Sequence, residues 1–187
     1  MKKAVSIFLA VFCLFGLLSC AHTPEPEYAF TVAYASYVDY RILSKAASNA
    51  DLLADQQLTH FPVFVMDTYE DLQLFMAKYD GILSMDQGHD DILSVNDALE
   101  KAQFDREVFF EENSLLVVYA PSKNASFRYE IKDIKNNDGN MCVTLEEKAL
   151  SKGLADVRAG WMFFVELDDQ EANSCQSFDA IIDRKGE

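Results

Sequence analysis

The sequence contains few of the residues and none of the short motifs by which many enzymes are recognised. Its 187 residues include only three histidines. No Gly-x-Ser-x-Gly elbow, phosphate-binding loop, dinucleotide fingerprint or His-Glu-x-x-His pair occurs. With 31 carboxylates in the chain, adjacency in sequence also selects no acid and base pair. We therefore predict no catalytic residue and no cofactor.

Basic residues are also scarce. Sixteen Lys and Arg stand against 31 Asp and Glu, which gives a net charge of −15. Such a surface repels the phosphate backbone of nucleic acids and anionic lipid headgroups, so nucleic acid is not expected as a partner. An acidic excess is by itself also a common means of keeping a protein soluble.

The start of the chain has the layout of an export signal. Lys2 and Lys3 precede an uncharged, largely apolar run over 4–18. The sequence Leu-Leu-Ser-Cys that ends at Cys20 resembles the lipobox of bacterial lipoproteins, in which the cysteine is acylated and becomes the first residue. The resemblance implies a signal peptide over 1–19 and attachment to a lipid bilayer through Cys20. An uncleaved membrane helix is the alternative, but the run is at or below the short end of the about 17 to 25 residues that a span needs.

We expect the mature chain to be a short tether, 20–27, followed by a single domain over 28–187. Pro24 and Pro26 suit an extended linker, because proline cannot continue a helix or a central strand. Loss of the signal removes two of the 16 basic residues, which leaves 14 against 31 acidic ones and a net charge of −17. The expected location is the cell membrane or the outer membrane, with the domain facing the exterior or the periplasm.

Two cysteines remain in the domain once Cys13 has left with the signal and Cys20 carries lipid. Cys142 and Cys175 could form a disulfide, because an exported chain meets an oxidising compartment. Two buried free thiols are the alternative. Neither cysteine has the neighbouring Cys or His that is typical of zinc sites, so metal ligation is not expected.

The loop 85–93 concentrates side chains that can bind a metal. Asp86, Asp90 and Asp91 surround Gly88. Their spacing does not match a calcium loop, in which acidic ligands recur at alternate positions and a glutamate completes the shell. We interpret the loop as solvated acid and keep the three aspartates only as secondary candidates for a metal site.

The first half of the domain mixes strands and helices. Alternation with period 2 predicts a strand from 28 to 34, and a short apolar strand at 61–67 precedes a helix over 68–81. Thr68 and Asp71 resemble a capping box, and a glycine is expected to end the helix at 81. Further predictions are a loose helix over 44–58, a helix from Ser94 to about Gln103 capped together with Asp97, and another turn capped by Asp105.

The second half consists mainly of predicted strands. The continuous apolar run at 114–120 is typical of a strand buried on both faces, so it should be central. A strand at 127–134 slips in register, which indicates a bulge near Asp133, and the Asp-Gly turn that follows predicts a hairpin. Strands at 159–167 and 177–183 complete an antiparallel meander packed against two or three short helices. The predicted fold class is α+β.

Trp161 is the only tryptophan in the chain. It could stack against a ligand, but its alternation with Phe163 and Val165 is more typical of a core residue. We therefore predict that Trp161 supports the sheet.

One stretch of predicted strands, 114–167, follows the pattern of a known family. The segments LLVVYAPSKNASFRYEIKDIKNNDGNMCVTLEE and GWMFFVEL resemble the C-terminal domain of the PrcB family. That family includes a regulatory lipoprotein subunit of a bacterial surface protease complex and many uncharacterised lipoproteins. The chain departs from it at 122–126, where SKNAS replaces a glycine-rich turn, and it lacks the Pro-Tyr before the last strand. The resemblance covers about a third of the chain and implies no catalytic residues.

These observations favour a non-catalytic, surface-tethered module that binds another protein of the envelope. The lipid anchor, the absent motifs, the acidic surface and the likeness to a protease-complex subunit all support this hypothesis. One alternative is a solute- or metal-binding lipoprotein, or a hydrolase that uses carboxylates, and this alternative requires a concave polar pocket. The other alternative is a structural envelope component without a specific ligand.

Overall fold

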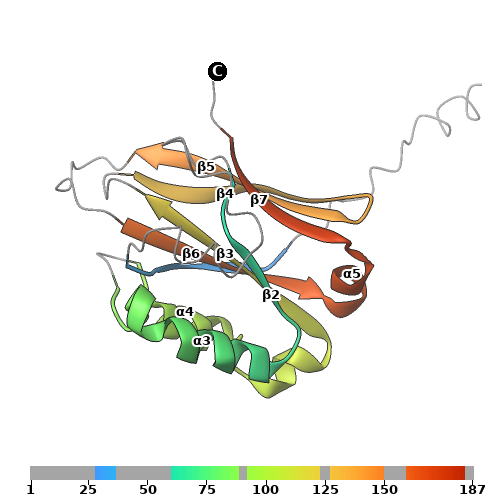
Figure 1. The fold of residues 1–187 in the computed structure, drawn as a ribbon, viewed down its shortest axis with the longest axis horizontal. Helices are drawn as coiled ribbons and strands as arrows, with labels where there is room; N and C mark the ends of the chain where they lie inside the picture. Colours follow the sequence, from blue (N-terminus) through green and yellow to red (C-terminus); the bar gives the residue numbers. More distant parts are fainter. Residues whose placement is uncertain (1–27, 37–59, 89–91, 123–126, 150–158, 184–187) are drawn as a thin grey trace, which may run out of the picture.

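Three layers make up the part of the chain that the computed structural model describes, residues 28–36, 60–88, 92–122, 127–149 and 159–183 (Figure 1). Helices cover one face of a four-stranded sheet, and a three-stranded sheet covers its other face. The α+β class and the packing of strands against short helices are thereby confirmed. In chain order the elements are β1 (Phe30–Tyr34), β2 (Val63–Met66), α3 (Tyr69–Leu83), α4 (Val95–Ala102), the 3-10 helix η2 (Glu107–Glu111), β3 (Asn113–Ser122), β4 (Phe127–Asn137), β5 (Asn140–Ala149), β6 (Ala159–Asp168), α5 (Asp169–Ser174) and β7 (Ser177–Asp183).

Several sequence-based predictions concern residues outside these ranges. The signal with Cys20, the helix expected over 44–58, and the two aspartates Asp90 and Asp91 all lie outside the described residues. None of the described helices combines the length and the apolar character that crossing a bilayer requires.

The four-stranded sheet forms the middle layer. Its strand order is β1-β6-β3-β2, and each neighbouring pair is antiparallel. β3 contains the apolar run 114–120 and is buried along almost its whole length between its two neighbours. The prediction of a central strand is confirmed, and its consecutive apolar residues fit a strand that is covered on both faces.

The three-stranded sheet has the order β4-β5-β7. Asp138 and Gly139, with φ values of 52° and 87°, turn β4 into β5 as the Asp-Gly signal predicts. The pairing of β4 with β5 shifts between Ile131 and Asp133, which confirms the bulge. β7 then runs parallel to β5, and Asn140 lies opposite Ser177.

The strand order differs from a single meander because β6 belongs to the middle layer. Eight of its ten residues are buried, and they point to both faces of the sheet. A strand of this kind needs a layer on each side, which the outer sheet does not provide. β6 therefore pairs with β3 and β1, and β5 and β7 become direct neighbours.

Two hydrophobic cores lie on the two faces of the middle sheet. Met162 and Phe164 of β6 face the helices, whereas Trp161 and Phe163 face the three-stranded sheet. Trp161 is 1% exposed, and its ring meets that of Tyr34 edge-on at 5.7 Å between centroids. Trp161 is therefore a core residue, as its strand position predicts.

The caps of the two main helices follow the sequence signals. Thr68 accepts a hydrogen bond from the backbone N–H of Asp71 at 3.1 Å, and Ser94 begins α4 in the same way. The predicted end of α3 at Gly81 is wrong, because the helix continues to Leu83, which is buried in the core. The residue in the left-handed conformation that ends the helix is Ser84, with φ of 45°.

Candidate binding groove

The acidic loop does not form a metal site in the residues that the structure describes. The carboxylate of Asp86 accepts a hydrogen bond from the side-chain amide of Asn96. Asp90 and Asp91 lie outside the described residues. No group of three or more His, Cys, Asp or Glu side chains in the described ranges is arranged to hold a metal ion. Asp86 is thus engaged at the start of α4, and the secondary interpretation of these aspartates as metal ligands gains no support.

The structure does not bring the two cysteines together. Both carry free thiols. Cys142 lies between Met141 and Val143, whose side chains point into the core between the sheets, so its own side chain points away from that core. Cys175 ends α5 and packs against that core. Burial raises the pKa of both thiols. The arrangement favours the pair of free thiols over the disulfide, and thiol titration can test this.

A histidine, an aspartate and a cysteine lie close together between the residues that precede β2 and the strands β5 and β7. His60 Nδ1 lies 3.0 Å from the carboxylate of Asp179, and Cys142 lies opposite Asp179 in the parallel pairing of β5 with β7. Burial raises the pKa of the Cys142 thiol, so the thiol stays neutral rather than becoming an activated nucleophile. His60 also forms a β-bridge to Ile181, which indicates that the contact between His60 and Asp179 helps to fasten β7 to the residues before β2.

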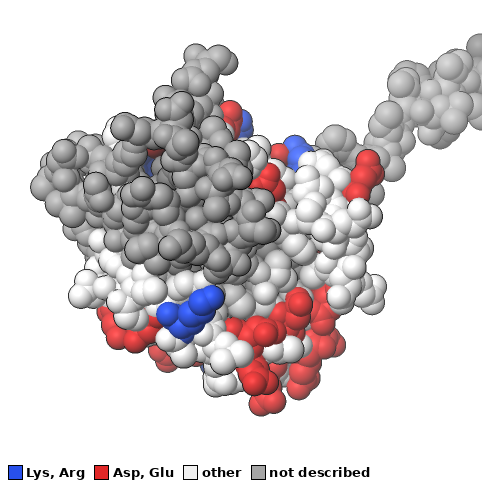
Figure 2. All heavy atoms as spheres, in the orientation of Figure 1, with Lys and Arg blue, Asp and Glu red and all other residues white. Residues whose placement is uncertain are grey.

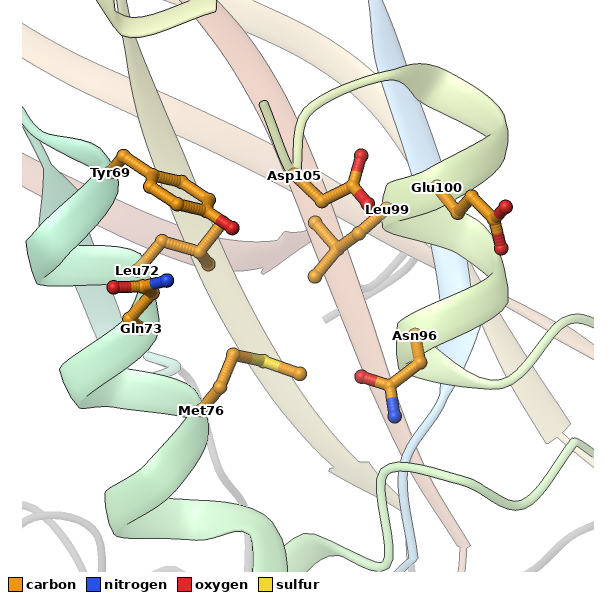
Figure 3. A pocket seen from close by; sticks show the side chains of 8 residues that line it. All are labelled: Tyr69, Leu72, Gln73, Met76, Asn96, Leu99, Glu100 and Asp105. Atoms are coloured by element: carbon orange, nitrogen blue, oxygen red, sulfur yellow. The ribbon is translucent and has the colours of Figure 1, made fainter. Parts of the chain in front are cut away.

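A concave surface lies between the two main helices (Figure 3). The cavity has a volume of about 440 Å³. α3 contributes the apolar side chains of Leu72 and Met76, and α4 contributes Leu99 from the opposite wall. Polar groups surround this apolar floor. They belong to Tyr69, Gln73, Asn96, Glu100 and Asp105.

Asp105 is the residue of this groove whose role differs most from its sequence-based prediction. The predicted cap is wrong, because the residue at the start of η2 is Arg106 and no side chain caps that helix. The Oδ1 atom of Asp105 is buried and has no hydrogen-bond partner in the described structure. A buried carboxylate oxygen without a partner is unfavourable by about 1 to 3 kcal/mol. Asp105 also lines the groove, so a partner that displaced the groups covering Oδ1 would supply the missing donor.

The groove continues into a second hollow of about 570 Å³ beside η2. Both hollows share Tyr69 and Gln73. The ring of Tyr69 lies 6.3 Å from that of Phe110 between centroids, so aromatic surface connects the two hollows. The remaining residues of the second hollow are Thr68, Glu70, Glu107 and Glu111. Together the two hollows form an elongated surface with apolar walls and an acidic rim, which we call the helical groove.

The whole helical layer is strongly acidic. Its described residues 67–88 and 92–112 contain eleven Asp and Glu against three Lys and Arg. None of these carboxylates is in a salt bridge within the described part of the chain. Figure 2 shows the carboxylates gathered over the helices at the lower edge of the view. Leu74 and Val108, which are 61% and 64% exposed, add apolar surface to the same layer.

Sequence reasoning missed the helical groove, although part of its signal was present. The face of α3 that carries Tyr69, Gln73 and Met76 repeats every three to four residues, as a helical face does. Its mixture of apolar and polar side chains differs from the purely apolar face that Phe75 and Tyr79 present to the core. The opposite wall comes from α4 and the turn after it, and only the packing of the helices places it there.

Comparison with known proteins identifies no relative. No family of proteins, no curated protein and no solved structure matches the chain. The likeness of 114–167 to the PrcB family therefore stays a prediction.

Proposed function

We propose that this protein is a lipid-tethered, non-catalytic module that binds another protein of the cell envelope through the helical groove. One observation carries the proposal. The groove combines an apolar floor with carboxylates that no cation of the described residues neutralises, including the partnerless Oδ1 of Asp105. A surface of this composition fits a basic segment that also carries apolar side chains.

The shape of the groove favours a chain segment over a small solute. Its two hollows, about 440 and 570 Å³, meet at Tyr69 and Gln73 and form one elongated surface. Leu74 and Val108 extend the apolar area of the helical layer beyond the hollows. A partner segment that follows the groove would bury this apolar area and place its Lys or Arg side chains against Asp105, Glu107 and Glu111. Complementary charge also accelerates association and directs the choice of partner.

The lipid anchor belongs to the same proposal. Acylation of Cys20 would hold the domain beside the bilayer, where envelope proteins are at high local concentration. We expect Cys20→Ala to release the protein from membranes of its native host into the soluble fraction. Fractionation together with metabolic labelling by a fatty acid checks this. Persistent membrane attachment of the variant, with no acyl label on the parent protein, contradicts the anchor.

The binding proposal is tested by crosslinking the native lipoprotein in its own cells and identifying the partner. Asp105→Asn removes one negative charge from the groove while it preserves the size of the side chain. We expect the yield of the crosslinked partner to fall roughly tenfold, because a hydrogen bond to a charged group contributes about 1.5 to 3 kcal/mol. The matched control is Glu147→Gln, which removes one exposed charge from β5 and should leave the yield unchanged.

Two results contradict the binding proposal. The first is an equal yield of the same partner from the parent and from Asp105→Asn. The second is a large thermal stabilisation by calcium or a small solute in the absence of any protein partner, which supports the solute-binding alternative.

A further inference from the structure

β1 is an edge strand, and most of its outward backbone groups have no backbone partner among the described residues. The N–H of Ala35 donates to Gly160, and the C=O of Ala29 accepts from Glu166, so the odd-numbered residues of this stretch bond to β6. In an antiparallel pair the intervening residues point their N–H and C=O groups away from the partner strand. These residues are Phe30, Val32 and Tyr34.

Only the end of this outer edge is occupied in the described structure. The N–H of Tyr34 donates to the C=O of Leu93 at 2.9 Å. No backbone hydrogen bond to the outward groups of Phe30 or Val32 is present among the described residues. Each of these two residues therefore has one N–H and one C=O available to an additional strand.

A groove of about 510 Å³ follows this open edge. Three consecutive residues of β1, Phe30 to Val32, line one side of it, and four consecutive residues of β4, Arg128 to Ile131, line another. Successive side chains of a strand point to opposite faces, so a run of consecutive lining residues means that the strand edge itself borders the groove. β1 and β4 are edge strands of the two different sheets. The groove thus lies where the edge strands of the two sheets meet.

The chemistry of this edge groove is opposite to that of the helical groove. Its inner part is apolar, with Trp161 and Ile131, and Phe30 is 49% exposed at its border. Two cations, Lys101 and Arg128, and one carboxylate, Glu130, lie along it. The Arg128 Nη2 atom donates to Glu130 at 2.6 Å, but its Nε is buried and has no hydrogen-bond partner in the described structure. This donor requires an acceptor, and a carboxylate is the best one.

We propose that the edge groove accepts an extended segment of another protein as an added strand beside β1, with apolar side chains on the inner side and a carboxylate that reaches Arg128. Strand addition of this kind obtains affinity from main-chain hydrogen bonds and specificity from alternate side chains. The outward N–H and C=O groups of Phe30 and Val32 are available for these main-chain hydrogen bonds. The apolar inner part of the groove and the two cations provide the specificity. The proposal is independent of the helical groove, which requires a basic occupant.

The structure also limits the length of the added strand. The bulge between Ile131 and Asp133 interrupts the edge of β4, and Leu93 already occupies the edge of β1 at Tyr34. A short regular edge flanked by charged residues resists indiscriminate pairing with other sheets. A segment of a few residues fits this edge, whereas a long strand does not.

The test uses the full-length lipidated protein in detergent micelles and a synthetic peptide of alternating Val and Glu as the probe. Hydrogen exchange measured by mass spectrometry should show slower exchange in the β1 segment when the probe is present. A probe with N-methylated backbone amides on alternate residues carries the same side chains but cannot complete the strand hydrogen bonds. It should bind about tenfold more weakly or worse and should leave the exchange of β1 unchanged.

Two variants locate the interaction on the protein. Val32→Pro removes an outward N–H that has no partner in the described structure, and proline is tolerated at such an edge position. The matched control Val32→Ala keeps this N–H. The probe should therefore bind Val32→Pro about tenfold more weakly than Val32→Ala. Arg128→Gln should weaken binding similarly. The control Lys148→Gln removes a cation of β5 that lies outside the groove and should have no effect. If Val32→Pro fails to fold, the comparison of the methylated and unmethylated probes still tests whether the peptide binds as an added strand.

Several outcomes overturn the proposal. Equal binding of the methylated probe means that no strand forms. Protection of α3 instead of β1 places the acidic probe elsewhere. Protection of β1 that grows with protein concentration in the absence of the probe means that the occupant is a second copy of this chain.

Discussion

The two outer layers cover opposite faces of the same middle sheet, yet they carry charge in different ways. The three-stranded sheet has four Lys and Arg, and each of them is in a salt bridge with a carboxylate of the same sheet. The helical layer has eleven carboxylates and three cations in its described residues, and none of those carboxylates is so paired. The two layers therefore differ most clearly in whether their charged side chains form salt bridges within the layer.

This difference indicates which outer face has the stronger long-range attraction for a charged partner. Paired charges on the three-stranded sheet make a solvated face with little long-range field. Unpaired carboxylates around an apolar groove create a field that attracts cations and leave Asp105 Oδ1 without a hydrogen bond. The helical layer is accordingly the face on which a partner would bring the largest gain in free energy.

The largest expected effect concerns the core that the layers share. Trp161→Ala should lower the free energy of unfolding by about 3 to 5 kcal/mol, because it removes a fully buried indole between the two sheets. The control Leu74→Ala, in the exposed part of the helical layer, should change it by less than about 0.5 kcal/mol. Chemical denaturation measures both. Free quenching of Trp161 fluorescence by iodide in the folded protein would show that its side chain is not in the core.

A smaller effect concerns Tyr28, which joins the chain before β1 to α5. Its hydroxyl donates to Glu171 Oε1 at 2.7 Å, and burial, followed by this carboxylate, raises the pKa of Tyr28. Because the pKa of Tyr28 is raised in the folded state, its protonated hydroxyl stabilises the fold below the ordinary tyrosine pKa of about 10. This stabilisation is lost as the pH rises above that value. Tyr28→Phe should cost about 1 kcal/mol at pH 7 and reduce the loss of stability above pH 10. Denaturation at several pH values measures this, and an unchanged alkaline slope in the variant would contradict it.

The smallest effect concerns the paired charges of the three-stranded sheet. Lys148 donates to Glu146 at 2.6 Å, but the lysine side chain is 40% exposed. Exchanging it for alanine should lower the free energy of unfolding by about 1 kcal/mol or less, because water already screens such a pair. High salt should shrink the difference between parent and variant further. A loss of several kcal/mol would mean that the pairs of this sheet hold the fold together and that the contrast between the layers concerns stability.

The thiols offer a separate check on the three-stranded sheet. Because burial raises the pKa of Cys142 and Cys175, iodoacetamide should alkylate both slowly at pH 7 in the folded protein and quickly after unfolding. Titration of the unfolded, unreduced protein should find two free thiols in addition to any at unprocessed cysteines. Their absence would show that the two cysteines are bridged in the exported protein.

Local signals in the sequence predicted the elements better than their arrangement. The caps at Thr68 and Ser94, the bulge before Asp133 and the central β3 follow from a few neighbouring residues, and the structure confirms them. The placement of β6 beside β3 and the parallel pairing of β5 with β7 depend on contacts between distant segments, which periodicity does not encode. The helical groove was missed for the same reason. Asp105 had an ordinary local explanation as a cap, and only the packed helices leave it facing a cavity.

The most direct measurement is the calorimetric titration of the protein purified from its native host with a synthetic peptide of alternating Lys and Leu at several salt concentrations. The unpaired carboxylates of the helical groove predict binding that weakens steadily as salt rises and that falls roughly tenfold in Asp105→Asn but not in Glu147→Gln. Binding that is insensitive to salt, or equal in the two variants, would contradict the proposal that the helical layer is a binding face.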